Sequence, residues 1–167
     1  MNQISEERRE ELAACAAALA RHNIVAAQLN CAESTLWGVL EALDLPMDET
    51  LLRMATPFGG GMGDSAAVCG ALVAAIMALG VVLGRAQLDT PRKLVAYERT
   101  RRLYDRFVVT AGSDTCRLLN PLGFERPDLR PFCARFVELA ARLAVEVLLT
   151  GDPEAERMAY AQAQEQR

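Results

Sequence analysis

The sequence predicts an all-α protein, a single domain of about seven or eight helices packed around a central apolar helix over residues 66–84. Three observations predict this fold class. Apolar residues recur at helical spacing, and no stretch shows the alternation of a strand. Alanine is abundant while aromatic residues make up only 5% of the chain, which suits closely packed helices. The 167 residues suffice for one core, and no linker divides residues 1–167.

The first two helices are predicted from their N-terminal capping residues. Ser5 can cap a helix that runs through Ala20, and Cys15 lies on the apolar stripe of that helix. Asn30 is the next N-cap, with Glu33 three residues later as its capping-box partner. The thiol of Cys31 is therefore expected at the first position of the second helix.

A glycine-rich segment separates a short helix, which is capped by Asp48, from the central apolar helix. Four glycines among residues 59–63 cannot form a stable helix. Asp64 or Ser65 is expected to cap the apolar helix, which carries no charge over residues 66–84. This stretch is long enough for a membrane span. Its alanine and glycine content and the lack of a second span favour a helix buried in the bundle.

The second half of the chain contains three more helix starts and ends in a polar segment. The expected starts are Thr90-Pro91, Ser113-Asp114 and Asp128, and the expected ends are Gly112, Pro121 and Gly151. Residues 152–167 are expected to form a last polar helix or tail.

Charge and the N-terminal sequence limit the function classes. A net charge of −4 argues against a nucleic-acid-binding surface. The acidic N-terminus does not resemble a signal peptide, so a cytoplasmic location, where thiols stay reduced, is expected. One basic cluster is the exception, formed by Arg99, Arg101, Arg102 and Arg106. We expect a solvated face paired with acidic residues, and the alternative is a docking site for an acidic redox partner.

Four of the five cysteines lie in the first or second turn of a predicted helix, and these are Cys31, Cys69, Cys116 and Cys133. Helix N-termini favour the thiolate, which is both the nucleophile and the metal ligand. The alternative is that these small side chains only fill gaps in an alanine-rich core. Their spacing contains no Cys-x-x-Cys pair, so any shared site must be assembled by the fold.

The sequence resembles the family of redox-active proteins named for its C-GCAxxG-C-C cysteine pattern, over roughly residues 20–149. The matching segments are Asn30-Cys31-Ala32-Glu33-Ser34, Phe58-Gly59-Gly60-Gly61-Met62-Gly63, Cys69-Gly70-Ala71, Cys116-Arg117-Leu118-Leu119 and Cys133. The resemblance implies a helical fold and four cysteines that act together in a redox role. It further implies an iron–sulfur-type cluster, or another thiolate-bound metal, as a candidate cofactor held by Cys31, Cys69, Cys116 and Cys133. Cys15 has no counterpart in the pattern.

Two other features have alternative interpretations. Gly59, Gly60, Gly61 and Gly63 are candidates for a cofactor-binding loop whose amides face thiolates or an anionic group. A tight turn that lets helices pack closely is the interpretation we favour. His22 is the single histidine, and we expect it at a helix end rather than as a metal ligand.

The leading hypothesis is electron or thiol–disulfide transfer by the four cysteines, as an oxidoreductase or a redox carrier. The alternative is a non-catalytic helical interaction module, or a bundle that binds a small anion, in which cysteines serve only in packing. The expected partners are a redox protein or a small-molecule substrate. A second copy of the chain is a further candidate partner, because the apolar helix over residues 66–84 could be partly covered by it.

Overall fold

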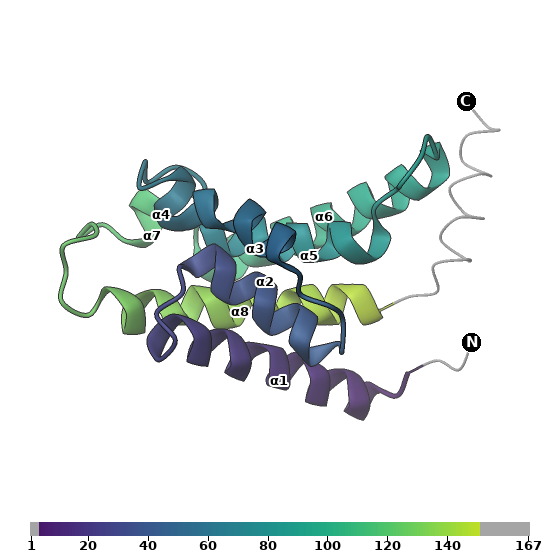
Figure 1. Ribbon diagram of the computed structural model, residues 1–167, viewed down its shortest axis with the longest axis horizontal. Coiled ribbons are helices and arrows are strands. Elements are labelled where there is room, and N and C mark those ends of the chain that lie inside the picture. Colours follow the sequence, from purple (N-terminus) through teal and green to yellow (C-terminus); the bar gives the residue numbers. More distant parts are fainter. Residues whose placement is uncertain (1–3, 151–167) are drawn as a thin grey trace.

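A computed structural model describes residues 4–150, and within this range the chain is helical (Figure 1). The predicted all-α class is therefore confirmed for the described residues. The helices are α1 (Glu6–Val25), α2 (Cys31–Ala42), α3 (Glu49–Ala55), the 3₁₀ turn η1 (Thr56–Phe58), α4 (Gly59–Met62), α5 (Gly70–Leu83), α6 (Thr90–Ala111), α7 (Cys116–Leu119) and α8 (Leu129–Leu149). The polar helix predicted over residues 152–167 lies outside the described part of the chain.

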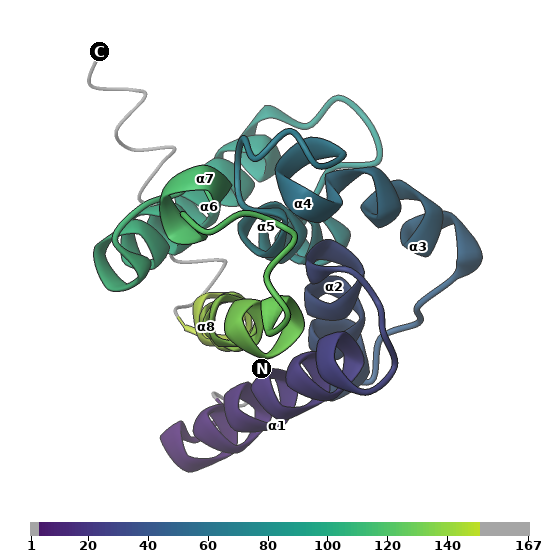
Figure 2. The same cartoon turned by 90° about the vertical axis from the view of Figure 1, so that its left-hand side faces the viewer.

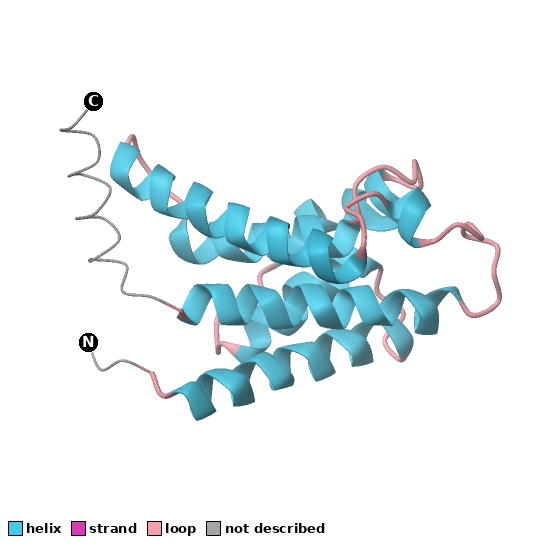
Figure 3. Ribbon diagram, turned by 180° about the vertical axis from the view of Figure 1, so that it is seen from behind, coloured by secondary structure: helices cyan, strands magenta, loops and turns pink. Residues whose placement is uncertain are grey.

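Helices α2, α5 and α8 contact one another at the centre of the bundle. Helix α1 packs on α2 and α8 from one side, and α6 packs on α5 and α8 from the other. Figure 2 shows these layers end-on, and Figure 3 shows the short α7 and the loop before α8 at one end of the molecule. Helices α1, α3 and α6 run towards this end and α2, α5 and α8 run away from it, so α2, α5 and α8 all begin there (Figure 1).

Most helix starts follow the predicted caps. The Ser5 hydroxyl accepts a hydrogen bond from the Arg8 N–H, and Asp48 accepts one from the Leu51 N–H. Asn30 and Glu33 form the predicted capping box at the start of α2. Asp128 precedes α8 but makes no capping hydrogen bond, because its carboxylate pairs with Arg126.

The start of the central helix was predicted wrongly. Asp64 and Ser65 do not cap it, and α5 begins only at Gly70, after a loop over residues 63–69. In this loop Val68 pairs with Thr115 in an isolated antiparallel bridge, so the backbone hydrogen-bonds to another segment instead of entering a helix. Among the described residues, no helix is long and apolar enough to span a membrane.

Small side chains allow the helices to approach closely. Gly70, Ala74 and Ala78 form a buried stripe of small residues on α5. Gly38 of α2 lies directly against Ala20 of α1: a Cβ atom at position 38 would come within 2.7 Å of the Ala20 backbone nitrogen. This contact therefore requires glycine at position 38.

The arginine cluster on α6 is not one surface. Arg99 is buried, with 1% of its area exposed, and its guanidinium donates to the carbonyl oxygens of Val147 and Thr150 at the end of α8. The prediction that Arg99 lies on a solvated face is therefore wrong. Its guanidinium instead donates hydrogen bonds to carbonyl groups that have no partner within the helix at the C-terminus of α8. The other three arginines pair with acidic residues as expected: Arg101 with Asp105, Arg102 with Glu98, and Arg106 with Glu146.

We predict that Gly38→Ala destabilises the fold by about 1–3 kcal/mol, because the added methyl group must displace backbone atoms of α1. Gly80→Ala is the matched control within α5, because a Cβ atom there meets nothing within 4 Å. The free energy of unfolding of this control should rise by about 0.5–1 kcal/mol, because alanine reduces the backbone entropy of the unfolded chain. Urea unfolding followed by circular dichroism measures both, and equal stabilities of the two variants would contradict the close contact.

Candidate functional site

The four cysteines of the predicted set gather at the end of the bundle where the helices begin. Cys31 is the first residue of α2, Cys116 is the first residue of α7, and Cys69 is the N-cap of α5. Cys133 lies in the second turn of α8. Cys31, Cys116 and Cys133 line one pocket, and Cys69 precedes Gly70, where a Cβ atom would lie 2.7 Å from the Cys31 sulfur.

Cys31 is held in place by a hydrogen-bond network at the start of α2. The Asn30 side chain accepts from the Ala32 and Glu33 N–H groups and donates to the Thr56 carbonyl oxygen at 3.0 Å. The Thr56 hydroxyl donates to Glu33 at 2.6 Å, which ties η1 to α2. Glu33 is therefore a capping residue, as predicted, and the network fixes the helix turn that carries the Cys31 thiol.

Two loops joined by backbone hydrogen bonds place Cys69 beside Cys116. The Cys69 N–H donates to the Asp114 carbonyl oxygen at 2.7 Å, and the Cys116 N–H donates to the Ala67 carbonyl oxygen at 2.6 Å. The Val68–Thr115 bridge lies between these two bonds. The sequence could not predict this pairing, because residues 66–69 were assigned to the apolar helix.

The glycine loop lies against this cysteine group. A Cβ atom at Gly61 would lie 2.7 Å from the Cβ atom of Cys116, and one at Gly70 would lie 2.7 Å from the Cys31 sulfur. The backbone N–H groups of Gly60 and Gly70 face the Cys31 sulfur and favour its thiolate. Gly59 instead packs on the Asn30 side chain, and Gly63 is exposed. Gly60 and Gly61 have positive φ values of 61° and 67°, so the segment labelled α4 is the favoured tight turn rather than a regular helix, and it also directs one amide at a thiol.

Cys133 lies beside a stack of aromatic and guanidinium groups. The Arg126 and Arg135 guanidiniums lie over the Phe132 ring, 3.6 and 4.0 Å from its centroid. Phe132 and Phe136 meet edge to face. The charges of both arginines act on the Cys133 thiol and oppose the effect of its burial.

Three of the cysteines open into one pocket of about 300 Å³. Its lining consists of Ile24, Leu29, Asn30, Cys31, Gly60, Asp64, Cys116, Phe124, Leu129, Arg130 and Cys133. Cys69 is not part of this lining and is 6% exposed, which makes it the least exposed thiol of the group.

Burial keeps these thiols protonated. Burial raises the pKa of Cys31, although the backbone N–H groups around it lower it. Burial and the charge of Cys31 raise the pKa of Cys69 to about 12, and burial with the nearby sulfurs raises that of Cys133 to about 11. The pKa of Cys116 is raised by burial and then by Cys31 and Asp64. The expected stabilisation of thiolates at helix N-termini is therefore wrong, because desolvation outweighs the N–H groups.

The donor chemistry of four thiols suits an iron–sulfur cluster. However, within residues 4–150 no group of three or more His, Cys, Asp or Glu side chains is arranged to hold a metal ion. The ligand role of Cys31, Cys69, Cys116 and Cys133 stays a prediction.

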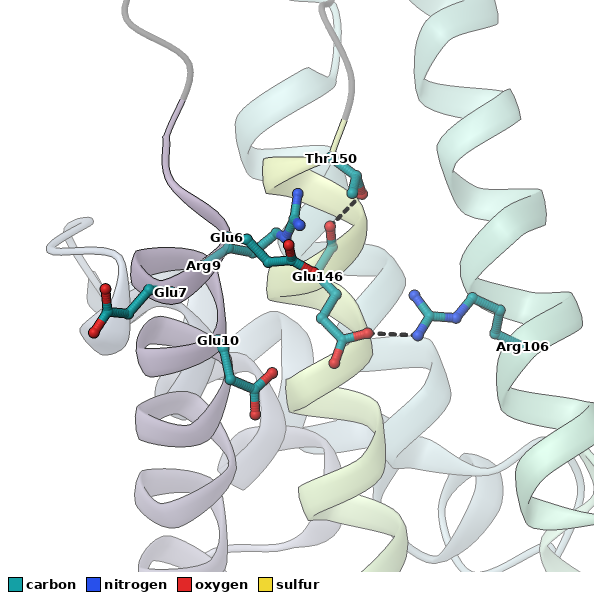
Figure 4. A pocket seen from close by; sticks show the side chains of 7 residues that line it. All are labelled: Glu6, Glu7, Arg9, Glu10, Arg106, Glu146 and Thr150. Atoms are coloured by element: carbon teal, nitrogen blue, oxygen red, sulfur yellow. Dashed lines mark hydrogen bonds and ion pairs between the residues drawn. The ribbon is translucent and has the colours of Figure 1, made fainter.

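Two residues singled out in the sequence lie outside the site. Cys15 is exposed on α1 rather than on its buried stripe, and His22 is exposed near the end of the same helix. A second hollow, of about 420 Å³, lies where α1 begins and α8 ends, far from the cysteines (Figure 4). It is lined mainly by charged side chains, including the Glu146–Arg106 ion pair.

Sequence reasoning missed several residues of the pocket. Asp64 was read as a helix cap, and Phe124, Leu129 and Arg130 were not singled out. Asp64 directly follows the glycine loop, and this position is the one feature of the sequence from which its proximity to the cysteines could have been predicted. The loop that carries Phe124 has no such signal, because its position depends on the packing of α8.

The chain matches one family of known proteins. The family described as "Putative redox-active protein (C_GCAxxG_C_C)" matches residues 29–147, a range that contains the four clustered cysteines and excludes Cys15. The chain belongs to this family. A relative from Archaeoglobus fulgidus, described as an uncharacterized protein, is 32% identical over 127 residues, which cover 71% of this chain and 84% of the relative. No solved structure matches the chain.

We predict that alkylation by iodoacetamide at neutral pH modifies Cys15 first, because its side chain is exposed while the clustered thiols are buried and protonated. Since the thiolate is the nucleophile, alkylation of Cys133 should accelerate about tenfold per pH unit between about pH 7 and pH 10. Peptide mass spectrometry of timed samples measures each site. A rate at Cys133 that levels off below about pH 8 would show a lowered pKa and contradict the effect of burial.

Proposed function

We propose that this protein is a two-electron thiol–disulfide redox protein whose active group is the set Cys31, Cys69, Cys116 and Cys133. The single observation that carries the proposal is that three of these thiols line one pocket, while the fourth, Cys69, precedes Gly70, which lies against the Cys31 sulfur. Cysteines used only for packing would not need to share a pocket with solvent access. Membership of a redox-active family supports the same conclusion.

The chemistry proceeds by thiol–disulfide exchange. A thiolate of the site attacks one sulfur of a substrate disulfide, forms a mixed disulfide and expels the first substrate thiolate. A second cysteine then attacks the protein sulfur of the mixed disulfide and expels the other substrate thiolate. Two electrons pass to the substrate, the two protons of the cysteines go to the released thiolates, and a protein disulfide remains.

Burial of the thiols favours this reaction over steps that leave charge in the site. The dithiol and disulfide forms are both neutral, so a change of two electrons and two protons leaves no ion in the desolvated pocket. Cys31 is the central member of the redox pair, because it shares the pocket with Cys116 and Cys133, lies against Gly70 next to Cys69, and has four backbone N–H groups that favour its thiolate. The predicted cytoplasmic location, a redox protein or small molecule as substrate, and a homodimer remain parts of this proposal.

We predict that Cys31→Ser abolishes the reversible disulfide, whereas Cys15→Ser leaves it unchanged. The protein is equilibrated in dithiothreitol redox buffers under anaerobic conditions, and the thiols are trapped and counted by mass spectrometry. Cys15 is a matched control because it lies on the same bundle but outside the pocket. A wild-type protein with no thiols lost across the titration contradicts the proposal. Iron and acid-labile sulfide in anaerobically purified protein would instead support the cluster.

We predict that the midpoint potential of the pair falls by about 59 mV for each pH unit between about pH 6 and pH 9, because both thiols stay protonated over this range. The same titration at several pH values measures this slope. Thiols with ordinary pKa values would give a shallower slope near the upper end of the range. A shallow slope there would contradict the neutral, buried pair.

A further inference from the structure

The pocket that contains the thiols has an apolar wall. Ile24 and Leu29 come from the end of α1 and the turn after it, and Phe124 and Leu129 come from the loop before α8 and its first residue. These four side chains line the same pocket as Cys31, Cys116 and Cys133. A pocket of about 300 Å³ is at the lower end of the range for small-molecule sites, roughly 300–1,000 Å³.

The two charges in the lining have opposite signs. Arg130 is directed towards the end of α1, where its Nη1 donates to the carbonyl oxygens of Ile24 and Leu29 at 3.3 and 2.9 Å. Asp64 lies against Gly60, so close that a Cβ atom there would come within 1.9 Å of its Oδ1. Its carboxylate acts on the Cys116 thiol. The lining itself therefore has no net positive charge and has a carboxylate that acts on Cys116, whereas Arg126 and Arg135 act on Cys133 from outside the lining.

We propose that this pocket selects low-molecular-weight disulfides whose substituents are apolar and uncharged, and that Asp64 and Phe124 determine this selectivity. The inference rests on the proposed thiol–disulfide function and names its substrate class. An apolar substituent gains contacts with the wall at Phe124. An anionic substituent loses water and meets the Asp64 carboxylate with no net positive charge in the lining to compensate.

The exchange is the balanced reaction given above. One thiolate of the pocket attacks the substrate disulfide, and a second cysteine releases the mixed disulfide. Two molecules of the uncharged substrate thiol leave, and one protein disulfide forms. A dithiol such as dithiothreitol returns the protein to its reduced state.

The test compares two chromogenic aromatic disulfides, neutral 4,4′-dithiodipyridine and dianionic 5,5′-dithiobis(2-nitrobenzoate). Stopped-flow rate constants are measured on reduced Cys15→Ser protein, and each is divided by the rate constant for 2-mercaptoethanol in the same buffer. We expect the normalised rate constant of the neutral reagent to exceed that of the anionic reagent by about tenfold or more. This ratio corresponds to a difference in activation free energy of about 1.4 kcal/mol. The ratio of the two rates cancels the thiolate fraction of the attacking cysteine.

Two variants locate the selectivity. Asp64→Asn should lower the ratio by about threefold or more, and asparagine tolerates the positive φ of 61° at this position. Asp114→Asn is the matched control: that carboxylate is two residues from Cys116 but bonds to Tyr104 and is not part of the lining. Phe124→Ala should slow the neutral reagent more than the anionic one, and Phe124→Leu should restore most of its rate.

The outcomes separate this inference from the proposed function. A normalised ratio near one, or a preference for the anionic reagent, overturns the selectivity even if the dithiothreitol titration shows a reversible disulfide. An unchanged ratio in both Asp64→Asn and Phe124→Ala overturns the assigned residues. A titration without any reversible disulfide overturns the proposed function, and the selectivity with it.

Discussion

The cysteine site depends on backbone contacts that only glycine permits. At Gly70 a Cβ atom would lie 2.4 Å from the Phe58 carbonyl oxygen as well as 2.7 Å from the Cys31 sulfur, and at Gly61 it would overlap the Cβ atom of Cys116. Any side chain at these two positions would push the glycine loop away from the starts of α2 and α7 and so separate the thiols. The same glycines leave room for a backbone N–H to face a sulfur, which a bulkier residue would block. Both the close packing and the N–H group directed at the sulfur therefore require glycine at these positions.

Much of the fold could be predicted because its signals are local. The Asn30–Glu33 capping box, the start at Thr90-Pro91 and the end at Gly112 need only neighbouring residues, and each helix boundary falls where these signals place it. The errors concern residues whose environment depends on distant segments. Residues 66–69 leave the helical pattern because Thr115 and Cys116 offer hydrogen-bond partners, and Arg99 is buried because the end of α8 lies beside it. The gathering of the cysteines could be proposed from their positions at helix starts, but it required the alternating helix directions to bring those starts together.

The ionisation of the site shows how two local rules can conflict. A helix N-terminus favours a thiolate, whereas removal from water favours a thiol. Only the first effect can be predicted from the sequence, because the sequence locates the N-terminus of a helix but not how deeply the thiol there is buried. In the structure Cys69 is at an N-cap and still has a raised pKa, since it is 6% exposed and adjoins other sulfurs. Such a site is better suited to exchange between neutral dithiol and disulfide forms than to the storage of several thiolates.

The conformation of the loop after the glycines also requires an explanation. Met62, Asp64 and Ala66 all have positive φ values, although none of them is a glycine, and such conformations cost on the order of 1 kcal/mol each. Part of this cost is offset by the hydrogen bonds that Ala66 and Ala67 make to Gly60, Gly61, Cys116 and Arg117. A helix over these residues would avoid the strain but would carry the Asp64 carboxylate away from Gly60 and separate Cys69 from Cys116. The strained loop is therefore the conformation in which two thiols and a carboxylate can line the same end of the bundle, which links the backbone geometry of residues 60–66 to the selectivity proposed for the pocket.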